Sequence, residues 1–127
     1  MINPEQLSRY RQTIRKISDR IEHLASRCLF SDPLIHGSAT EVFRKCGRAN
    51  CKCATNDADR HGPYKVIQVV RDGKSRQVCL RRKQEEQWQL AEHYQYQMEK
   101  LAELKETCLE LQQTVTEIIE KRVQKFP

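Results

Sequence analysis

The chain has 127 residues and a mass of 15.0 kDa, with 38% hydrophobic and 6% aromatic residues, a mean hydropathy of −0.80 and a formal net charge of +6. This composition excludes a thick globular core, because so short a chain has little volume for its surface. No apolar stretch approaches the roughly 20 residues that a membrane span needs, and the first residues lack the pattern of an export signal. We therefore expect a cytoplasmic protein whose six cysteines do not form a disulfide framework in that reducing compartment.

Positive charge is concentrated in the middle of the chain. Residues 64–83 carry seven basic side chains against one acidic, whereas residues 84–127 carry five against nine. Residues 1–30 and 31–63 have smaller excesses of positive charge, six against three and five against four. A basic segment beside an acidic one indicates a surface that faces a polyanion.

The first predicted helix begins at Asn3. Asn3 suits the cap position, Pro4 the first helical position, and Gln6 the reciprocal bond of a capping box. Apolar residues then recur at alternating spacings of three and four: Leu7, Tyr10, Ile14, Ile17, Ile21, Leu24 and Cys28. This heptad seam is typical of a helix that packs one narrow stripe against a partner helix. Pro33 is expected to end the helix, because the residue before a proline avoids the helical region.

A second helix is predicted from about residues 83–86 to Lys125. Its seam is Leu90, Tyr94, Gln97, Leu101, Leu104, Cys108, Leu111, Val115 and Ile118, interrupted only by the polar Gln97. The two helices are expected to pair antiparallel, since an isolated seam is marginal in water. The longer second helix then overhangs and leaves these residues without an internal partner: Leu111, Val115, Ile118, Ile119 and Val123. The overhang predicts a homodimer; in the alternative, the tail bends back or frays.

Residues 64–81 have the pattern of a β-hairpin. Two segments rich in β-branched residues flank Asp72-Gly73, which suits the two positive-φ positions of a type I′ turn. A two-residue turn sets the register of the strands as Arg71–Lys74, Val69–Arg76, Ile67–Val78 and Lys65–Leu80. A third strand is expected at residues 40–45, because two strands alone are not stable in water.

The segment after that strand contains a cluster of cysteines. Three cysteines lie within eight residues, and His61 follows eight residues after the last of them. Thiolate and imidazole are ligands that Zn²⁺ favours, and a structural zinc site fills all four positions with protein ligands. A bound metal supplies about 10–16 kcal/mol of apparent folding free energy, which suits a head with so little apolar surface. The predicted metal ligands are Cys46, Cys51, Cys53 and His61.

Several alternatives stay open for the cysteines and histidines. Cys79 or His36 can replace His61 as the fourth ligand, and His61 can instead belong to a tight turn and bond to the backbone. The three clustered thiols can serve redox chemistry, a disulfide or plain packing in place of a metal. Cys28 and Cys108 lie on the two helical seams, where a free cysteine behaves as a small hydrophobe.

Together these elements predict an α+β fold. A long antiparallel helical hairpin of coiled-coil type carries a small zinc-bound head, built from the β-hairpin and a third strand, inserted between its two helices. The expected domains are an N-terminal coiled-coil helix at residues 1–30, the zinc-binding β-hairpin head at 31–83, and a C-terminal coiled-coil helix at 84–127.

The cysteine segment and the hairpin resemble one protein family. The matching residues are Cys46, Gly47, Asn50, Cys51, Cys53, His61, Gly62, Pro63, Tyr64, Gly73 and Lys74. They are similar to an uncharacterised prokaryotic family of small proteins, one of the numbered domains of unknown function, over about residues 36–110. The resemblance implies a zinc-bearing head and a setting near transposases and other mobile-element genes, and it brings no established activity. The strand after Tyr64 departs from the family in being aliphatic, where more aromatics are expected.

The sequence shows no constellation of catalytic residues. It has no Ser/His/Asp arrangement, no Gly-rich phosphate loop, and neither part of the His-x-Glu and Pro-Cys-x-x-Cys signature of zinc deaminases. We therefore expect a protein that is not an enzyme.

The basic residues favour nucleic-acid binding, with DNA favoured over RNA. A two-stranded ribbon fits the major groove of DNA, and Arg and Lys suit phosphates and guanine edges. The candidate contact residues, expected to form one basic surface, are Arg44, Lys45, Arg48, Lys52, Arg71, Lys74, Arg76, Arg81, Arg82 and Lys83. The expected function is that of a small zinc-binding accessory protein of a mobile element or recombination system, whose basic hairpin contacts the nucleic acid.

The basic residues are also consistent with two alternatives to nucleic-acid binding. In one, the cations only guard an exposed edge strand against aggregation. In the other, the chain is a non-catalytic coiled-coil adaptor subunit whose head or acidic helix docks on a larger transposase, recombinase or other protein complex. Binding to duplex DNA that weakens steeply as salt rises separates nucleic-acid binding from both.

Overall fold

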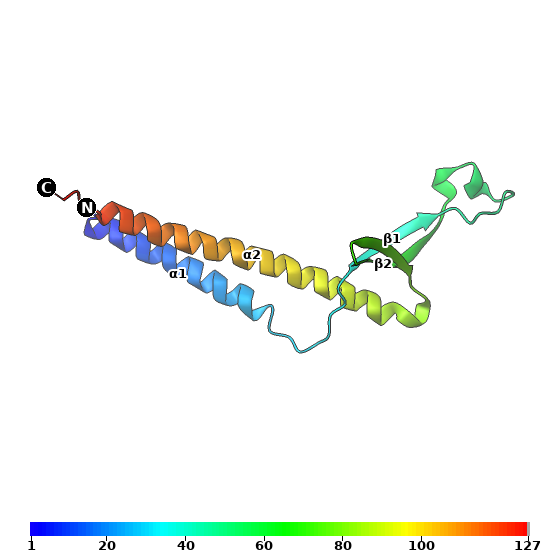
Figure 1. Ribbon diagram of the computed structural model, residues 1–127, viewed down its shortest axis with the longest axis horizontal. Helices are drawn as coiled ribbons and strands as arrows, with labels where there is room; N and C mark the ends of the chain where they lie inside the picture. The colour runs from blue at the N-terminus through cyan, green and yellow to red at the C-terminus, as the bar shows by residue number, and fades with distance from the viewer. Residues whose placement is uncertain (127) are drawn as a thin grey trace. The chain divides into compact units, whose positions relative to one another are not determined.

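The computed structural model describes residues 1–126. It contains an α+β chain with a three-stranded antiparallel sheet and a long C-terminal helix (Figure 1). In chain order the elements are α1 (Pro4–Ser26), β1 (Ser38–Arg44), β2 (His61–Arg71), β3 (Lys74–Cys79) and α2 (Glu85–Arg122), with short 3₁₀ turns η1 (Lys52–Ala54), η2 (Asp57–Asp59) and η3 (Arg82–Gln84). The chain divides into two compact units: one holds residues 1–31 and those from Gln97 onward, the other residues 32–96. Within residues 1–126 no helix combines the length and apolarity that crossing a membrane requires.

α1 begins as the sequence predicts. The Asn3 side chain accepts a hydrogen bond from the Gln6 amide at 2.8 Å, and the Gln6 side chain accepts one from the Asn3 amide at 3.1 Å. This reciprocal capping box satisfies two amides that the first helical turn leaves without partners. The helix ends at Ser26, earlier than predicted, because the next amides bond only three residues back, from Cys28 to Ala25 and from Leu29 to Ser26.

The less exposed residues of both helices follow the predicted seams. In α1 Leu24 is buried, and Tyr10, Ile14, Ile17 and Ile21 are half-buried, as is Cys28 just after the helix. Two predicted seam residues, Leu7 and Val115, are exposed. In the later part of α2 the half-buried residues include Leu101, Leu104, Cys108, Leu111 and Ile118. Thr107, which the predicted seam omits, is buried as well, and its hydroxyl donates to the Glu103 carbonyl at 2.8 Å.

α1 and the later part of α2 run antiparallel (Figure 1). The Met1 amino group donates to the Lys121 carbonyl at 3.0 Å, and at the other end the Gln97 side chain donates through Nε2 to the Arg27 carbonyl at 3.1 Å. The polar Gln97 that interrupts the predicted seam thus bonds to a carbonyl that the end of α1 leaves without a helical partner.

The predicted overhang of the second helix is therefore wrong. Because the amino terminus reaches Lys121, residues 111–118 of α2 are not beyond α1, as the sequence led us to expect. The extra length of α2 lies at its start, where residues 85–96 belong to the unit that contains the sheet.

The sheet has the strand order β1-β2-β3, and both pairings are antiparallel. β2 and β3 join through Asp72 (φ 52°) and Gly73 (φ 75°), as a type I′ turn requires. The predicted register is confirmed: Arg71 pairs with Lys74, and the Leu80 amide donates to the Lys65 carbonyl. β1 supplies the third strand, two residues earlier than predicted.

The start of α2 packs against the sheet and the segment before it. The Trp88 indole donates to the Thr40 carbonyl at 3.3 Å, and the Gln95 side chain accepts from the Ala39 amide at 3.1 Å. These bonds provide partners for backbone groups of β1, which is an edge strand. The buried residues of this unit are few: Cys53, Val66, Ile67 and Ala91.

Candidate metal centre

Three short elements bring the cluster of cysteines and histidine together. Cys46 follows the end of β1, Cys51 precedes η1, Cys53 lies within η1, and His61 is the first residue of β2. The chain turns directly after Cys46 at Gly47, whose φ of +84° favours glycine.

A β-bulge positions His61. Val42 pairs with Tyr64 and Arg44 with His61, so that one residue of β1 lies opposite two of β2, Gly62 and Pro63. Gly62 has a φ of +141°, and a Cβ at this position would lie 2.7 Å from the Val42 carbonyl oxygen. Proline has no amide to contribute to the ladder and is tolerated at a bulge. Bulges redirect neighbouring side chains, and His61 lies directly beside this one.

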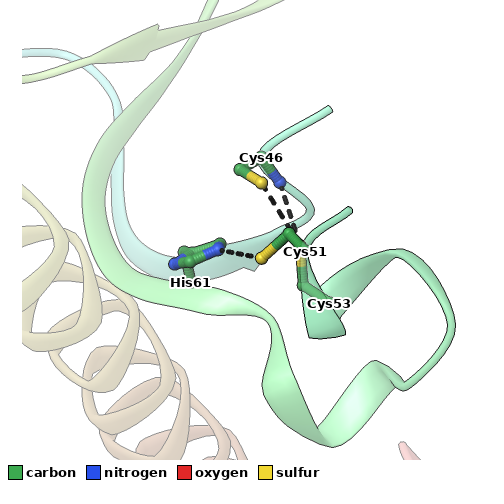
Figure 2. A group of neighbouring side chains, drawn as sticks. All are labelled: Cys46, Cys51, Cys53 and His61. Atoms are coloured by element: carbon green, nitrogen blue, oxygen red, sulfur yellow. Dashed lines mark hydrogen bonds between the residues drawn. The ribbon is translucent and has the colours of Figure 1, made fainter. Parts of the chain in front are cut away.

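The four donor atoms of the cluster lie within 4.8 Å of one another. Cys46 Sγ is 3.5 Å from Cys53 Sγ, and Cys51 Sγ is 3.2 Å from His61 Nε2 (Figure 2). The Cys46 amide also donates to Cys53 Sγ, at an N···S distance of 3.4 Å. Cys53 is fully buried, Cys51 is half-buried, and Cys46 and His61 are exposed.

These separations fit tetrahedral coordination of one metal ion. With metal–sulfur bonds of about 2.3 Å, a tetrahedral site sets its sulfurs about 3.8 Å apart. The separations of 3.5 and 3.2 Å are slightly shorter than such edges, and no pair exceeds 4.8 Å. The arrangement is compatible with a metal held by Cys46, Cys51, Cys53 and His61.

Hydrogen bonds favour the thiolate at two of the cysteines. The pKa of Cys46 is lowered, first by the Arg48 backbone amide and then by the Cys53 side chain. The pKa of Cys51 is lowered by the Cys53 backbone amide and by His61. Thiolates are the form that binds metal, so these contacts reduce the competition from protons.

The pKa of Cys53 moves in the opposite direction. A hydrogen bond from the Cys46 amide lowers it, but burial and the two neighbouring thiols outweigh that bond and raise it. A buried thiolate beside other thiolates is costly. A bound cation removes that cost, since it neutralises the charge at the centre of the cluster.

The structure places His61, rather than the other two candidates, beside the three thiols. Cys79 is exposed on β3, level with Val66, and the His36 ring makes an edge contact with the Tyr94 ring at a centroid distance of 4.9 Å. Cys108 is half-buried on α2, and Cys28 is half-buried in the turn just after α1. All six cysteines are free, so no disulfide competes for the thiols.

Residues 7–89 match the family described as Domain of unknown function (DUF6788). The chain belongs to this family. The match begins in α1 and ends in the first turns of α2, so it includes the whole sheet and the metal cluster. It starts earlier and ends earlier than the resemblance noted in the sequence. No curated protein and no solved structure matches the chain.

In this DUF6788 chain the ten candidate nucleic-acid contacts are all exposed. Among residues 1–126, Lys45 is the one member of the set with an ion pair, 3.7 Å from Asp57. Arg44 donates a hydrogen bond to the Gln77 side chain at 2.8 Å. The other eight make neither kind of contact through their side chains with residues of this range.

Seven of these cations fall into two groups, and the other three, Arg81, Arg82 and Lys83, follow the end of β3. Arg71, Lys74 and Arg76 surround the β2–β3 turn, and we call this group the hairpin tip. The cations next to the metal cluster lie at the opposite end of β2, which begins at His61 and ends at Arg71. These seven cations therefore do not lie side by side: the hairpin tip is at one end of the central strand and the cations next to the metal cluster are at the other.

A polar cluster between β2 and α2 has no counterpart among the residues predicted from the sequence. Lys65 forms an ion pair with Glu85, and its ammonium lies 4.8 Å from the centroid of the Trp88 ring. The hydrogen bond that the Lys65 ammonium donates to the Glu85 carboxylate raises the pKa of Lys65 and lowers the pKa of Glu85. No local pattern could have indicated this cluster, because its members come from different elements and have no common spacing.

Proposed function

We propose that the chain is a zinc-binding, nucleic-acid-binding accessory protein without catalytic activity of its own. Its metal centre is structural and holds Zn²⁺. Three thiols and one imidazole at tetrahedral separations are the donor set that zinc favours, and four protein ligands leave no open position for a substrate. Free thiols suit a reducing compartment, so we place the protein in the cytoplasm.

The observation that carries the nucleic-acid proposal is the hairpin tip. Three cations at the end of a two-stranded ribbon are exposed and make no ion pair among residues 1–126. Cations held on a rigid scaffold without acidic partners attract phosphates, and a two-stranded ribbon fits the major groove of B-form DNA. The major groove of an RNA helix is too deep and narrow for side chains to read, which favours duplex DNA over duplex RNA.

The helical unit supports the proposal in a second way. The seams of α1 and α2, and their antiparallel contacts, favour coiled-coil packing between them. Because the predicted overhang is absent, self-association would have to use the exposed Leu109 and Ile119 of α2. It would present two heads to a paired site, and a native mass measurement at several concentrations tests it. The mobile-element setting that the resemblance implies stays a prediction.

Fluorescence anisotropy with a labelled random-sequence duplex tests the proposal. The logarithm of the binding constant should fall linearly with the logarithm of salt concentration between about 50 and 200 mM. Reversing all three hairpin-tip charges (Arg71→Glu, Lys74→Glu and Arg76→Glu) should abolish binding at about 100 mM salt. Three phosphate contacts contribute about 2.7 to the magnitude of the slope of log binding constant against log salt concentration, and the variant loses all three. The same titration with duplex RNA distinguishes the two nucleic acids.

A matched control keeps the charge change constant. Arg11→Glu, Arg15→Glu and Lys16→Glu alter the net charge by the same amount, on exposed positions of α1. This variant should bind the duplex much more tightly than the hairpin-tip variant. Equal losses in the two variants would mean that net charge alone drives binding, and unchanged affinity in the hairpin-tip variant would exclude the tip as the contact surface.

A second candidate function is that of an adaptor, and exposed apolar residues on α2 favour it. Leu109 and Ile119 of α2, and Val123 just after it, are 52%, 54% and 71% exposed. If duplex DNA does not bind at about 50 mM salt, this surface becomes the main candidate for contact with a larger protein. Co-purification with and without Leu109→Lys and Ile119→Lys tests that role.

A further inference from the structure

A second candidate site lies where the end of the hairpin meets the start of α2. A cavity of about 400 Å³ is lined by Tyr64 and Lys65 of β2, Arg81 and Arg82 of the segment after β3, and Glu85 of α2. This volume is within the range of about 300–1,000 Å³ found for small-molecule sites. Pro63 and Leu80 complete the lining, all of which belongs to the unit of residues 32–96. None of the lining residues is a member of the metal cluster.

The cavity carries an excess of positive charge. Glu85 is the acidic group in its lining, and the Lys65 ammonium already binds that carboxylate. Arg81 and Arg82 make no ion pair with any residue in the range 1–126. Their two charges are therefore available to an anion, and a guanidinium offers paired donors that match phosphate oxygens.

An aromatic ring lines the same cavity. The Tyr64 side chain is 41% exposed, although the residue lies within the central strand of the sheet. The adjacent cross-strand hydrogen bond, from the Leu80 amide to the Lys65 carbonyl at 2.9 Å, places Tyr64 level with Arg81. An exposed ring next to a basic groove is the arrangement that binds single-stranded nucleic acid, because every base can stack on it.

We propose that this cavity binds a terminal nucleotide, with its phosphate monoester on Arg81 and Arg82 and its base against the Tyr64 ring. A phosphate monoester carries a charge of about −1.5 to −2 at pH 7, which matches two free guanidinium groups better than the single charge of an internal phosphodiester. The inference rests on the proposed nucleic-acid function and adds a preference for strand ends. The same chemistry fits a free mononucleotide, so the experiment includes both ligands.

Anisotropy of internally labelled single strands tests this site on the full-length, zinc-loaded protein. Strands with a 5′-phosphate, a 3′-phosphate or only hydroxyl ends are compared, and AMP and inorganic phosphate serve as competitors. One phosphorylated end should bind about tenfold more tightly than the hydroxyl form, as expected for charge-assisted hydrogen bonds. Arg81→Gln with Arg82→Gln should remove this preference.

Tyr64→Leu should weaken the binding of both the phosphorylated and the hydroxyl strands at least about fivefold, and Tyr64→Phe should restore binding because the ring is kept.

Two controls distinguish loss of the cavity site from unfolding of the head and from loss of the hairpin-tip contacts. Zinc content and far-UV circular dichroism of each variant confirm that the head is intact. Arg71→Gln with Arg76→Gln should weaken duplex binding and leave the preference for a phosphorylated end unchanged.

The outcomes distinguish this inference from the proposed function. Duplex binding with no preference for a phosphorylated end, or a preference that survives the double arginine substitution, overturns the terminal-nucleotide site and leaves the proposed function standing. Binding of AMP without binding of any strand supports the cavity as a mononucleotide site and refutes the nucleic-acid function. Competition by inorganic phosphate as strong as that by AMP refutes the role of Tyr64.

Discussion

Removal of the metal should unfold the segment between β1 and β2, residues 45–60. In this segment Cys53 is the one buried side chain, and Cys51 and Ala54 are half-buried. Complete burial of a valine side chain, which is larger than that of cysteine, contributes about 1.5 kcal/mol to folding, so burial of Cys53 contributes no more than about this amount. A structural zinc ion contributes about 10–16 kcal/mol, several times more than this segment gains from apolar burial and comparable to the total stability of a domain, about 5–15 kcal/mol.

Hydrogen exchange measured by mass spectrometry checks this expectation segment by segment. After chelation, or in the Cys51→Ser/Cys53→Ser variant, amides of residues 45–60 should exchange at the rates of an unfolded chain. The far-UV signal should keep most of its helical content, because α1 belongs to the other compact unit. Cys79→Ser is the matched control, since this exposed thiol lies outside the metal cluster.

Two results would refute this reasoning. Protection of residues 45–60 that persists after complete removal of the metal would show that the segment folds without an ion. Purified protein that contains no metal and still shows slow exchange in this segment would lead to the same conclusion, and the cysteines would then need a different role.

Two further predictions concern Gly62 and the Lys65–Glu85 ion pair. Gly62→Ala should lower the free energy of unfolding by about 1–3 kcal/mol and weaken metal binding, because the new Cβ would lie 2.7 Å from the Val42 carbonyl oxygen. Gly73→Ala is the control, since no atom lies within 4 Å of its Cβ, and it should lose less stability in a urea titration. Equal losses in the two variants would contradict the steric explanation. Glu85→Gln should destabilise the protein at pH 7, since the Lys65 hydrogen bond lowers the pKa of Glu85. The stabilisation from ionised Glu85 is fully present above its unfolded pKa of about 4.3 and is lost as the pH falls through its lower folded pKa. The urea midpoints of the variant and the wild type should therefore converge in acid. A difference between the midpoints that does not change with pH would exclude the charge of Glu85 as the cause.

Local features of the sequence determined most of the secondary structure and the clustering of the three cysteines. The capping box at Asn3 needs only residues three positions apart, and the turn at Asp72-Gly73 needs only the conformational freedom of two residues. That turn also sets the strand register, because a two-residue connection leaves one way to pair Arg71 with Lys74. Cys46, Cys51 and Cys53 are close in sequence, so their convergence requires only a short loop.

The tertiary structure decided which distant groups meet. A heptad seam repeats, so sliding one helix along the other by seven residues preserves its apolar contacts, and periodicity cannot set the register of α1 on α2. The contacts at Met1–Lys121 and Arg27–Gln97 show that the part of α2 that does not pair with α1 is its start. Similarly, the bulge beside Gly62 brings His61, and not Cys79 or His36, to the thiols, because the direction of a strand side chain depends on pairing with a distant strand.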